Sequence, residues 1–550
     1  MPNVRLAMVQ TNPTVGDISG NLVQILNACQ ESAKAGATLV VTGEMALTGY
    51  PIEDLATRAS FVASAESAVQ LLAERLQSAG LGALTVVVGH PKIAKDAQQS
   101  GWAIANNYAS VVENGKVVGG YAKHHLPNYS VFDEYRNFVA GESPFSFEHH
   151  GLRVGILICE DIWQRGSVVE SLDAQACDLT LVLNGSPFEI DKDDRRLSLT
   201  QDLAKRHDTH VAYVNLVGGQ DDLVFDGGSF VVDRHGNLVD QAEQFKEAQR
   251  ILDVSKETVT PLQPATATET STDWQIWNAL VLGLRDYCNK NGFKSVVLGL
   301  SGGIDSAVCA TLAADAIGAT NVYGVSLPSK YSSDHSKGDA EDLAERLGLN
   351  FSTVAIEPMV QAFETNLDLG GVASENLQAR VRGVILMGLS NSDGHLTLTT
   401  GNKTELAVGY STIYGDSVGG FAPIKDVEKT LVWRLAKWRN EFALEQGQVA
   451  PIPENSILKP PSAELRPDQT DQDTLPEYEL LDEILRLYVG KQESAAQIIS
   501  HGFDSAVVNR IVSLVDRAEW KRRQSAIGPK ITGMAFGRDR RLPVTNKSKE

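Results

Sequence analysis

The sequence predicts an α/β protein of two domains, a mixed layered sandwich followed by a doubly wound parallel sheet. Three observations support this class. The chain has 550 residues, enough for two to four domains, and 43% of them are apolar, as in ordinary globular proteins. Short apolar runs alternate with helical segments along its length. A polar segment at 254–271, rich in Ser, Thr and Pro, is typical of an inter-domain linker.

Residues 1–253 are expected to form the first domain, in which hairpins join some of the strands. Glu113-Asn114-Gly115 and the segment Asp233–Asn237 carry the turn residues of β-hairpins, which indicates a mixed sheet. We predict strands at Val4–Gln10, Thr38–Val41, Leu84–Gly89, Ala109–Glu113, Arg153–Ile158, Leu179–Asn184, His210–Leu216 and Ser229–Asp233. We predict helices at Asn21–Gly36, Ser60–Ala79 and Asp193–His207.

Residues 272–550 are expected to form the second domain. Strands and helices alternate here in the order of βαβ units, which build a parallel sheet. The segment Gly447–Pro476 is proline-rich and long for a loop, so we expect a substrate lid there. The predicted helices are Asp273–Lys290, Ser306–Ile317, Ser336–Leu347 and Ser374–Leu389, and the predicted strands are Ser295–Gly299, Val322–Ser326 and Thr397–Thr400.

Composition excludes several classes of partner. The net charge of −20 argues against nucleic acid, whose phosphates need a basic face. No stretch approaches the ~20 apolar residues of a membrane helix, and the N-terminus does not read as a signal peptide. Five cysteines without CxxC spacing predict neither a disulfide framework nor a zinc site, so we expect a cytoplasmic protein. Basic clusters at 521–523 and 538–541 are either solvated surface or contacts for a phosphate-rich small ligand.

A glycine-rich loop after a predicted strand indicates a phosphate site. Glycines let backbone N–H groups approach an anion closely, and the N-terminus of the next helix adds its positive end. The loop lacks the Gly-Lys-Ser/Thr ending of a Walker A loop, so Mg²⁺ and other residues must neutralise the phosphates. The alternative is a plain strand–turn–helix connection that needs glycine. The candidate ATP-binding residues are Gly299, Leu300, Ser301, Gly302, Gly303, Ile304, Asp305 and Ser306.

The run Ser-Gly-Gly-Ile-Asp-Ser resembles the pyrophosphatase loop of ligases that split ATP to AMP, among them NAD, GMP, asparagine and argininosuccinate synthetases. A second run, Thr399–Glu405, resembles the metal- and substrate-binding segment of NAD synthetases. This resemblance implies that Thr400 contacts ATP, that Asp305 and Glu405 share Mg²⁺ through hard oxygen ligands, and that Glu405 contacts deamido-NAD. Alternatively, Glu405 is a first-turn carboxylate favoured by the helix dipole.

Three further stretches extend the resemblance to NAD synthetases. The segment Asn376–Arg382 is similar to the nucleotide-contacting helix of that family, which implies that Asn376 binds deamido-NAD and Arg380 binds phosphate. Gly420–Val427 resembles the stretch that places a lysine, here Lys425, near phosphate. Trp520–Gln524 resembles the C-terminal segment over the dinucleotide, which implies a deamido-NAD contact for Lys521.

The first domain offers the groups that amide cleavage needs. Glu44, Lys123 and Cys159 lie in segments that match the Glu–Lys–Cys triad of the carbon–nitrogen hydrolases, in the same chain order. The resemblance implies an α-β-β-α sandwich like that of nitrilases. Cys159 would attack as a thiolate favoured by the neighbouring cation, Glu44 would carry its proton to ammonia, and Lys123 would stabilise the oxyanion. Alone, Cys159 would instead be interpreted as a buried strand cysteine.

A glutamine substrate also needs contacts for its α-carboxylate and α-amine. Ser186 and Lys192 resemble positions that bind glutamine in glutamine-fed relatives, and Tyr129 is a third candidate. Lys192 fits a solvated loop charge equally well.

Nearly the whole chain resembles the glutamine-dependent NAD synthetases, an amidase domain joined to an ATP pyrophosphatase domain. The resemblance implies adenylation of deamido-NAD by ATP, release of pyrophosphate, and displacement of AMP by ammonia from glutamine. It implies ATP and Mg²⁺ as cofactors, deamido-NAD, ATP and glutamine as ligands, and a homo-oligomer. Two alternatives remain: another glutamine-dependent AMP-forming amidotransferase, or a nucleotide-sensing module without catalysis.

Overall fold

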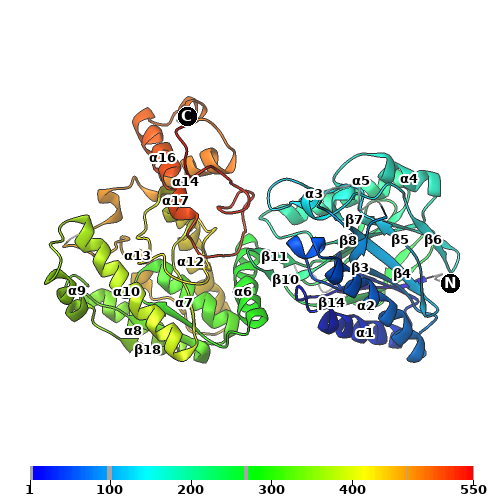
Figure 1. The fold of residues 1–550 in the computed structure, drawn as a ribbon, viewed down its shortest axis with the longest axis horizontal. Helices are drawn as coiled ribbons and strands as arrows, with labels where there is room; N and C mark the ends of the chain where they lie inside the picture. The colour runs from blue at the N-terminus through cyan, green and yellow to red at the C-terminus, as the bar shows by residue number, and fades with distance from the viewer. Residues whose placement is uncertain (1–3, 96–101, 265–270, 468, 549–550) are drawn as a thin grey trace. The chain divides into compact units, whose positions relative to one another are not determined.

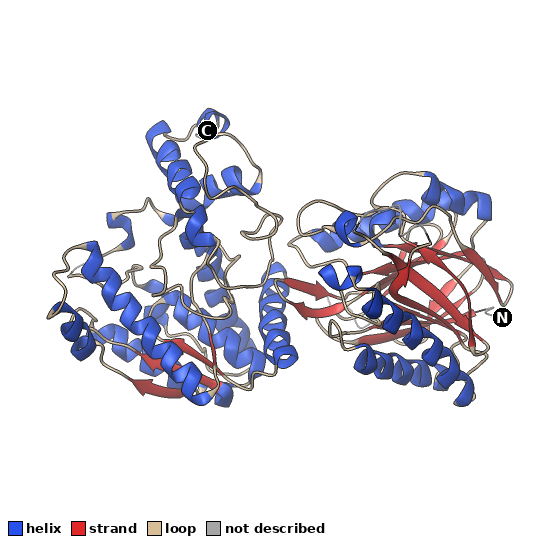
Figure 2. Ribbon diagram, viewed as in Figure 1, coloured by secondary structure: helices blue, strands red, loops and turns tan. Residues whose placement is uncertain are grey.

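The computed structural model describes residues 4–95, 102–264, 271–467 and 469–548. It divides into two compact units (Figures 1 and 2). The first comprises Met1–Gln220 and Val224–Thr270, and the second comprises Asp221–Leu223 and Ser271–Glu550.

The first unit contains two large sheets. The seven-stranded sheet has the order β15-β14-β1-β2-β3-β4-β5, and the six-stranded sheet has the order β13-β12-β9-β8-β7-β6. The first is built from β1 (Val4–Gln10), β2 (Leu39–Thr42), β3 (Thr85–Ile93), β4 (Ala105–Glu113), β5 (Lys116–Ala122), β14 (Ala248–Val254) and β15 (Val259–Pro261). The second is built from β6 (Ser146–His149), β7 (Leu152–Ile158), β8 (Leu179–Asn184), β9 (His210–Asn215), β12 (Phe230–Val232) and β13 (Leu238–Gln241). β10 (Val217–Gln220) and β11 (Leu223–Asp226) form a separate pair.

Helices cover the outer faces of both sheets, as Figure 2 shows. α1 (Ile18–Lys34) and α2 (Ala59–Ser78) pack on the seven-stranded sheet, whereas α4 (Ser167–Gln175) and α5 (Lys192–His207) pack on the six-stranded sheet. Apolar side chains of both sheets, such as Leu6, Ile156 and Leu181, share one buried cluster between them. The predicted α-β-β-α sandwich is therefore confirmed. Short helices complete the unit: η1 (Glu53–Thr57), α3 (Glu134–Asn137) and η3 (Cys159–Ile162).

The predicted linker at 254–271 is wrong in its first part. Val254 ends β14, and β15 pairs with β14 in antiparallel register, with Val254 opposite Val259 and Leu252 opposite Pro261. A Ser/Thr/Pro-rich segment joins the sheet here because it pairs with β14 across a short turn, in which the Ser255 N–H donates to the Thr258 carbonyl at 2.8 Å. The expected end of the first domain at residue 253 thus falls inside a sheet, and residues 265–270 lie outside the described residues.

The second unit contains the predicted doubly wound parallel sheet. Its order is β18-β17-β16-β19, and every pair is parallel. The chain leaves β16 in one direction and returns to its other side at β19, so a topological switch point lies between these two strands. The strands are β16 (Val296–Gly299), β17 (Val322–Ser326), β18 (Asn350–Thr353) and β19 (Leu396–Thr397). α6 (Thr272–Asn291) precedes β16, and the helices between the strands are α7 (Ile304–Ile317), α8 (Asp334–Leu347), α9 (Glu357–Glu364) and α10 (Val372–Asp393), with the turn η4 (Ala319–Asn321).

A helical portion follows β19 (yellow to red in Figure 1), which the sequence pattern did not resolve into elements. Its core is an apolar cluster that includes Leu481, Ile511 and Val515. The expected lid, Gly447–Pro476, is irregular except for α13 and η5. The elements are α11 (Lys403–Val408), α12 (Lys429–Glu445), α13 (Glu454–Leu458), η5 (Asp471–Asp473), α14 (Tyr478–Leu485), η6 (Arg486–Gly490), α15 (Ala495–Ser500), α16 (Ser505–Arg517) and α17 (Glu519–Arg522).

Two whole-chain features agree with the composition. Over the residues that the structure describes, no helix has both the length and the apolar character that crossing a bilayer requires. The five cysteines are buried and not joined in disulfides.

Candidate active sites

The three predicted amidase residues converge at the ends of strands in the first unit. Glu44 follows β2, Lys123 follows β5, and Cys159 opens η3 directly after β7. Lys123 Nζ lies 2.8 Å from Glu44 Oε1, and both side chains are at most 1% exposed. The charges of Glu44 and Lys123 both act on the Cys159 thiol. These three residues therefore form one buried constellation.

Glu134 is a fourth member that the sequence analysis missed. Its carboxylate lies 2.9 Å from Lys123 Nζ, so the lysine bridges two carboxylates. The Tyr50 hydroxyl donates to Glu134 Oε1 at 2.8 Å. A glutamate on the four-residue helix α3 carries no local pattern that marks it, and only tertiary folding brings it to Lys123.

Both oxygens of Glu44 are held in place. Asn107 Nδ2 donates to Oε1 at 2.6 Å, and the Gly185 backbone N–H donates to Oε2 at 2.7 Å. A carboxylate fixed at both oxygens keeps one orientation toward its neighbours, as a general base requires.

The cation expected to favour the Cys159 thiolate is present, but burial and a carboxylate oppose it. Burial and Glu44 raise the pKa of Cys159 well above its usual value, and Lys123 lowers it by less. Burial by itself would lower the pKa of Lys123. The negative charges of Glu134 and Glu44 outweigh this effect, so the pKa of Lys123 is raised. These shifts favour the neutral form of the Cys159 thiol and the charged form of Lys123. A neutral thiol must lose its proton before it attacks. Glu44 is the charged group that raises the pKa of Cys159 most.

The backbone at Cys159 is strained. Its φ is +44°, a left-handed conformation that non-glycine residues rarely adopt. The sharp change from β7 to η3 presents the thiol at the strand end and leaves the following N–H groups free of strand pairing.

Two of the three predicted glutamine contacts lie beside this constellation. The Tyr129 hydroxyl donates to Oε2 of Glu160 at 2.9 Å, and Glu160 directly follows Cys159 in the sequence. Ser186 is buried one residue after Gly185, and its Oγ accepts from Arg196 Nε at 3.1 Å. Lys192 is partly buried at the first position of α5.

The predicted phosphate loop joins β16 to α7. Gly302 has φ +74°, and a Cβ there would stand 2.3 Å from the Ser336 carbonyl oxygen, so only glycine fits. Ser301 Oγ accepts from the Gly303 N–H at 3.2 Å, and Ser306 Oγ donates to the Gly303 carbonyl at 3.0 Å. Side chains of the loop thus fix its backbone conformation at the N-terminus of α7, the kind of position that favours an anion.

Not every residue of this loop offers a side chain to a ligand. Leu300 is buried, and its N–H donates to the Val325 carbonyl at 2.9 Å, which continues the sheet. Gly299 ends β16, and the Ile304 side chain is buried at the start of α7. Thr400 follows β19, the parallel neighbour of β16, and so lies at the same edge of the sheet.

The two expected metal ligands share a partner that the sequence analysis missed. Lys429 Nζ contacts Asp305 Oδ2 and lies 3.2 Å from Glu405 Oε1. Asn402 Nδ2 donates to Asp305 Oδ1 at 3.0 Å, and Asn402 Oδ1 caps α11 by accepting from the Glu405 N–H at 2.9 Å. One short segment therefore aligns both carboxylates around a single ammonium.

Burial shifts the protonation equilibrium of the carboxylate and ammonium groups at this site. Burial raises the pKa of Glu405 to about 8, although Lys429 opposes the shift. Lys429 is buried at the first position of α12, and its Nζ lies 5.4 Å from the centre of the Tyr478 ring and 5.7 Å from that of Trp433. Its position in the sequence carries no motif, which is why it was overlooked.

Two candidate deamido-NAD residues, Asn376 and Lys521, and the candidate phosphate residue Arg380 meet at the loop after α11. Asn376 Oδ1 accepts from Thr412 Oγ1 at 2.8 Å, and Arg380 Nε donates to the Ile413 carbonyl at 3.2 Å. Lys521 Nζ donates to the Gly409 carbonyl at 2.7 Å and to the Ser411 carbonyl at 2.6 Å. Residues from α10 and α17 therefore gather around 409–413.

Lys425 has a different setting from the one expected. Its Nζ donates to the Ala526 carbonyl at 2.6 Å, and burial lowers its pKa. The ammonium that contacts Asp305 belongs to Lys429, four residues further along the chain.

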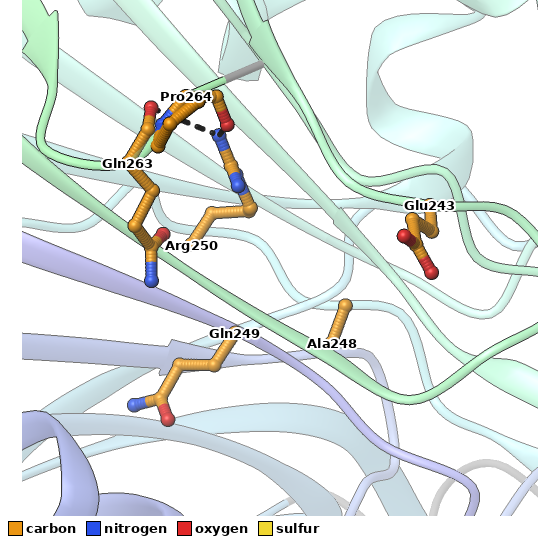
Figure 3. A pocket seen from close by; sticks show the side chains of 6 residues that line it. All are labelled: Glu243, Ala248, Gln249, Arg250, Gln263 and Pro264. Atoms are coloured by element: carbon orange, nitrogen blue, oxygen red, sulfur yellow. Dashed lines mark hydrogen bonds between the residues drawn. The ribbon is translucent and has the colours of Figure 1, made fainter. Parts of the chain in front are cut away.

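An open pocket of about 340 Å³ lies elsewhere in the first unit (Figure 3). Arg250 Nη2 donates to the Pro264 carbonyl there at 3.0 Å, and the pocket contains none of the predicted site residues. Its lining residues are Glu243, Ala248, Gln249, Arg250, Gln263 and Pro264.

Comparison with known proteins identifies both units. Residues 5–263 match the carbon-nitrogen hydrolase family, and residues 276–525 match the NAD synthase family. Curated relatives include the glutamine-dependent NAD(+) synthetase of Acinetobacter baylyi, 44% identical with 99% of each chain covered, and that of Xylella fastidiosa strain Temecula1, 44% identical with 99% of this chain and 98% of the relative covered.

A solved structure of the glutamine-dependent NAD+ synthetase from Acinetobacter baumannii, in complex with ADP, is 40% identical, with a TM-score of 0.77 and coverage of 99% of this chain and 98% of that one. The corresponding synthetase from Cytophaga hutchinsonii has a TM-score of 0.82 at 22% identity, with the same coverage, and so supports the fold alone. The full-length similarity at 40–44% identity is decisive: this chain belongs to the family of glutamine-dependent NAD(+) synthetases.

Proposed function

We propose that this chain converts deamido-NAD to NAD with ATP and with ammonia released from glutamine, and that the constellations around Cys159 and Asp305 carry the two reactions. The observation that carries the proposal is their presence in one chain of this family: a buried Glu44–Lys123–Cys159 group, and a glycine loop whose aspartate meets Glu405 and Lys429.

The first constellation suits cleavage of the glutamine amide. Glu44 takes the thiol proton while the Cys159 sulfur attacks the carboxamide carbon, and Lys123 stabilises the oxyanion. The C–N bond then breaks, and ammonia leaves with the proton that Glu44 returns. Water attacks the resulting thioester, again with Glu44 as base, and frees glutamate and the thiol. Glu134 holds Lys123 in place from its other side.

The second constellation suits attack of a carboxylate on ATP. The nicotinate carboxylate of deamido-NAD attacks the α-phosphorus, and pyrophosphate leaves toward the loop N–H groups and the N-terminus of α7. Lys429 and the loop offset the negative charge that collects there. Ammonia then attacks the adenylated carbonyl carbon, and AMP leaves as NAD forms.

The residues around Lys429 also fit a divalent cation. Mg²⁺ is commonly held by one or two carboxylates together with substrate phosphates, and Asp305 and Glu405 supply such hard oxygens on either side of the lysine. No larger group of His, Cys, Asp or Glu fit for a metal occurs in the described part of the chain, which suits a cation that arrives with its nucleotide. When bound, Mg²⁺ would neutralise the ATP phosphates.

The remaining ligand contacts stay proposals. Tyr129, Ser186 and Lys192 are assigned to the α-carboxylate and α-amine of glutamine. The assignments in the second unit are Thr400 to ATP, Asn376, Glu405 and Lys521 to deamido-NAD, and Arg380 and Lys425 to phosphate. The contacts of Lys425 with Ala526 make it the weakest member of this set.

One assay tests the function. Purified chain is incubated with deamido-NAD, ATP, Mg²⁺ and glutamine, and NAD, AMP and pyrophosphate are measured. Formation of all three in equal amounts is expected. ADP as the nucleotide product would contradict the phosphate-loop assignment. NAD absent while another carboxylate acceptor is amidated would favour a different amidotransferase.

Assembly and location are proposed separately. We expect a homo-oligomer, which sedimentation at several protein concentrations tests. Buried unpaired cysteines accord with a reducing cytoplasm, which localisation of a tagged chain tests.

A further inference from the structure

The buried carboxylate of Asp161, beside the amidase constellation, accepts several hydrogen bonds from neighbouring segments. Asp161 is fully buried two residues after Cys159. It accepts hydrogen bonds from four donors. Oδ2 accepts from the Ile158 N–H at 2.9 Å and from the Tyr121 hydroxyl at 2.8 Å, and Oδ1 accepts from the His124 N–H at 3.2 Å and from the His125 N–H at 2.9 Å.

These donors belong to the two chain segments that carry the nucleophile and the cation. Ile158 directly precedes Cys159, and its bond to Asp161 closes the strained turn at the cysteine. His124 directly follows Lys123. One side chain therefore ties the end of β7 to the end of β5 at the points where the two reacting groups emerge.

The four hydrogen bonds of Asp161 go to groups other than Cys159. The main charges acting on Cys159 are those of Glu44, Lys123, Glu160 and Glu134. The Asp161 oxygens accept from backbone and tyrosine donors, and the His125 ring Nδ1 lies 3.5 Å from Oδ1, so its orientation is fixed. Any effect on catalysis would act through the positions of Cys159 and Lys123.

We propose that Asp161 is a positioning residue for amide cleavage, which sets the separation and orientation of the Cys159 thiol and the Lys123 ammonium. The inference rests on the proposed glutaminase activity. An error of about 1 Å between such groups commonly costs about 10²-fold in rate. Binding of glutamine depends less on this joint, because Ser186 and Lys192 lie on other segments.

The main variant is Asp161→Asn. The amide keeps the shape of the carboxylate but replaces one acceptor oxygen with an NH₂ group. The two donors that bonded to that oxygen then face an NH₂ donor and lose their acceptor. We expect the kcat for glutamine hydrolysis to fall by about 10²-fold, with the KM for glutamine changed by less than about threefold. NAD synthesis from ammonium should stay at the wild-type rate. Alkylation of Cys159 by iodoacetamide, followed by peptide mapping from pH 6 to 9, should also slow.

Asp240→Asn is the matched control. Asp240 is an equally buried carboxylate of the same unit, but its partner is Arg250, and it contacts neither catalytic segment. Breaking that pair lowers stability. We expect a lower Tm for this control but wild-type glutamine hydrolysis and alkylation, which separates positioning from general damage.

A milder variant guards against misfolding. Tyr121→Phe removes one donor to Asp161 and keeps the carboxylate, so we expect glutamine hydrolysis to fall by about three- to tenfold with unchanged ammonium-driven synthesis. Wild-type glutamine hydrolysis and alkylation in folded Asp161→Asn would overturn the inference. If Asp161→Asn does not fold, wild-type hydrolysis by Tyr121→Phe overturns it. Absence of glutaminase activity in the wild-type chain would instead contradict the proposed function.

Discussion

Lys429 places its ammonium 3.2 Å from Glu405 Oε1, at the head of a helix that no motif marks. The same nitrogen contacts Asp305. The two carboxylates that are assigned to bind Mg²⁺ are therefore already bridged by the ammonium of Lys429. This relationship joins the three residues in one group, with two carboxylates around a single ammonium. Its members should therefore fail together when one is changed.

Lys429→Met tests that dependence. The variant leaves Asp305 and Glu405 without their common ammonium and removes a cation from the phosphate site. We expect NAD synthesis to fall by about 10²-fold or more with either glutamine or ammonium, while glutamine hydrolysis persists. Lys437→Met, on the same helix but outside this group, is the control. Normal ammonium-driven synthesis by Lys429→Met would remove the lysine from the reaction.

Asp305→Asn should stop synthesis from both nitrogen sources. Asparagine keeps the shape at the mouth of the phosphate loop but removes the charge that faces Lys429 and the proposed cation. Loss of one such electrostatic group commonly costs about 10²–10³ in rate. Asp315→Asn changes a carboxylate on the same helix that pairs with Arg439, and it should retain synthesis. Equal activity of the two variants would contradict the assignment.

Cys159→Ala should separate the two activities. We expect no detectable glutamine-driven synthesis and wild-type ammonium-driven synthesis, because the nucleophile serves only amide cleavage. Cys177→Ala, which changes another buried cysteine of the same unit, should retain both activities. If high ammonium does not rescue folded Cys159→Ala, the two reactions are not separable as proposed.

Glu134 predicts a pH-dependent stability. Burial raises its pKa from 4.5 to about 7, although Lys123 opposes the shift. Between these values the folded chain binds more protons than the unfolded chain, so this group's contribution to stability falls as pH rises from about 4.5 to about 7. Glu134→Gln lacks this titration. The Tm of Glu134→Gln minus that of wild type should therefore increase from pH 5 to pH 7, and a constant difference would contradict the shift.

Much of the fold could be predicted from the sequence because it depends on the local pattern of apolar and polar residues. β1 at Val4–Gln10, β8 at Leu179–Asn184 and β17 at Val322–Ser326 have the predicted bounds, since each is a short, mostly apolar segment. The strand–helix alternation also predicted the parallel sheet of the second unit correctly. The helices after residue 403 were not resolved, because their apolar cluster forms only when segments distant in sequence meet.

The sequence by itself determined the two chemistries, since a nucleophile in Ile-Cys-Glu-Asp and a glycine loop ending in Asp305 are properties of contiguous residues. Only the tertiary structure decided which partners complete them. Glu134 contacts Lys123. Lys429 contacts Asp305, which lies more than a hundred residues earlier in the sequence. It also decided that β15 extends a sheet rather than a linker. The physical reason is that burial and hydrogen bonding in the folded chain set these positions, both for the distant pair Lys429 and Asp305 and for the adjacent strands β14 and β15.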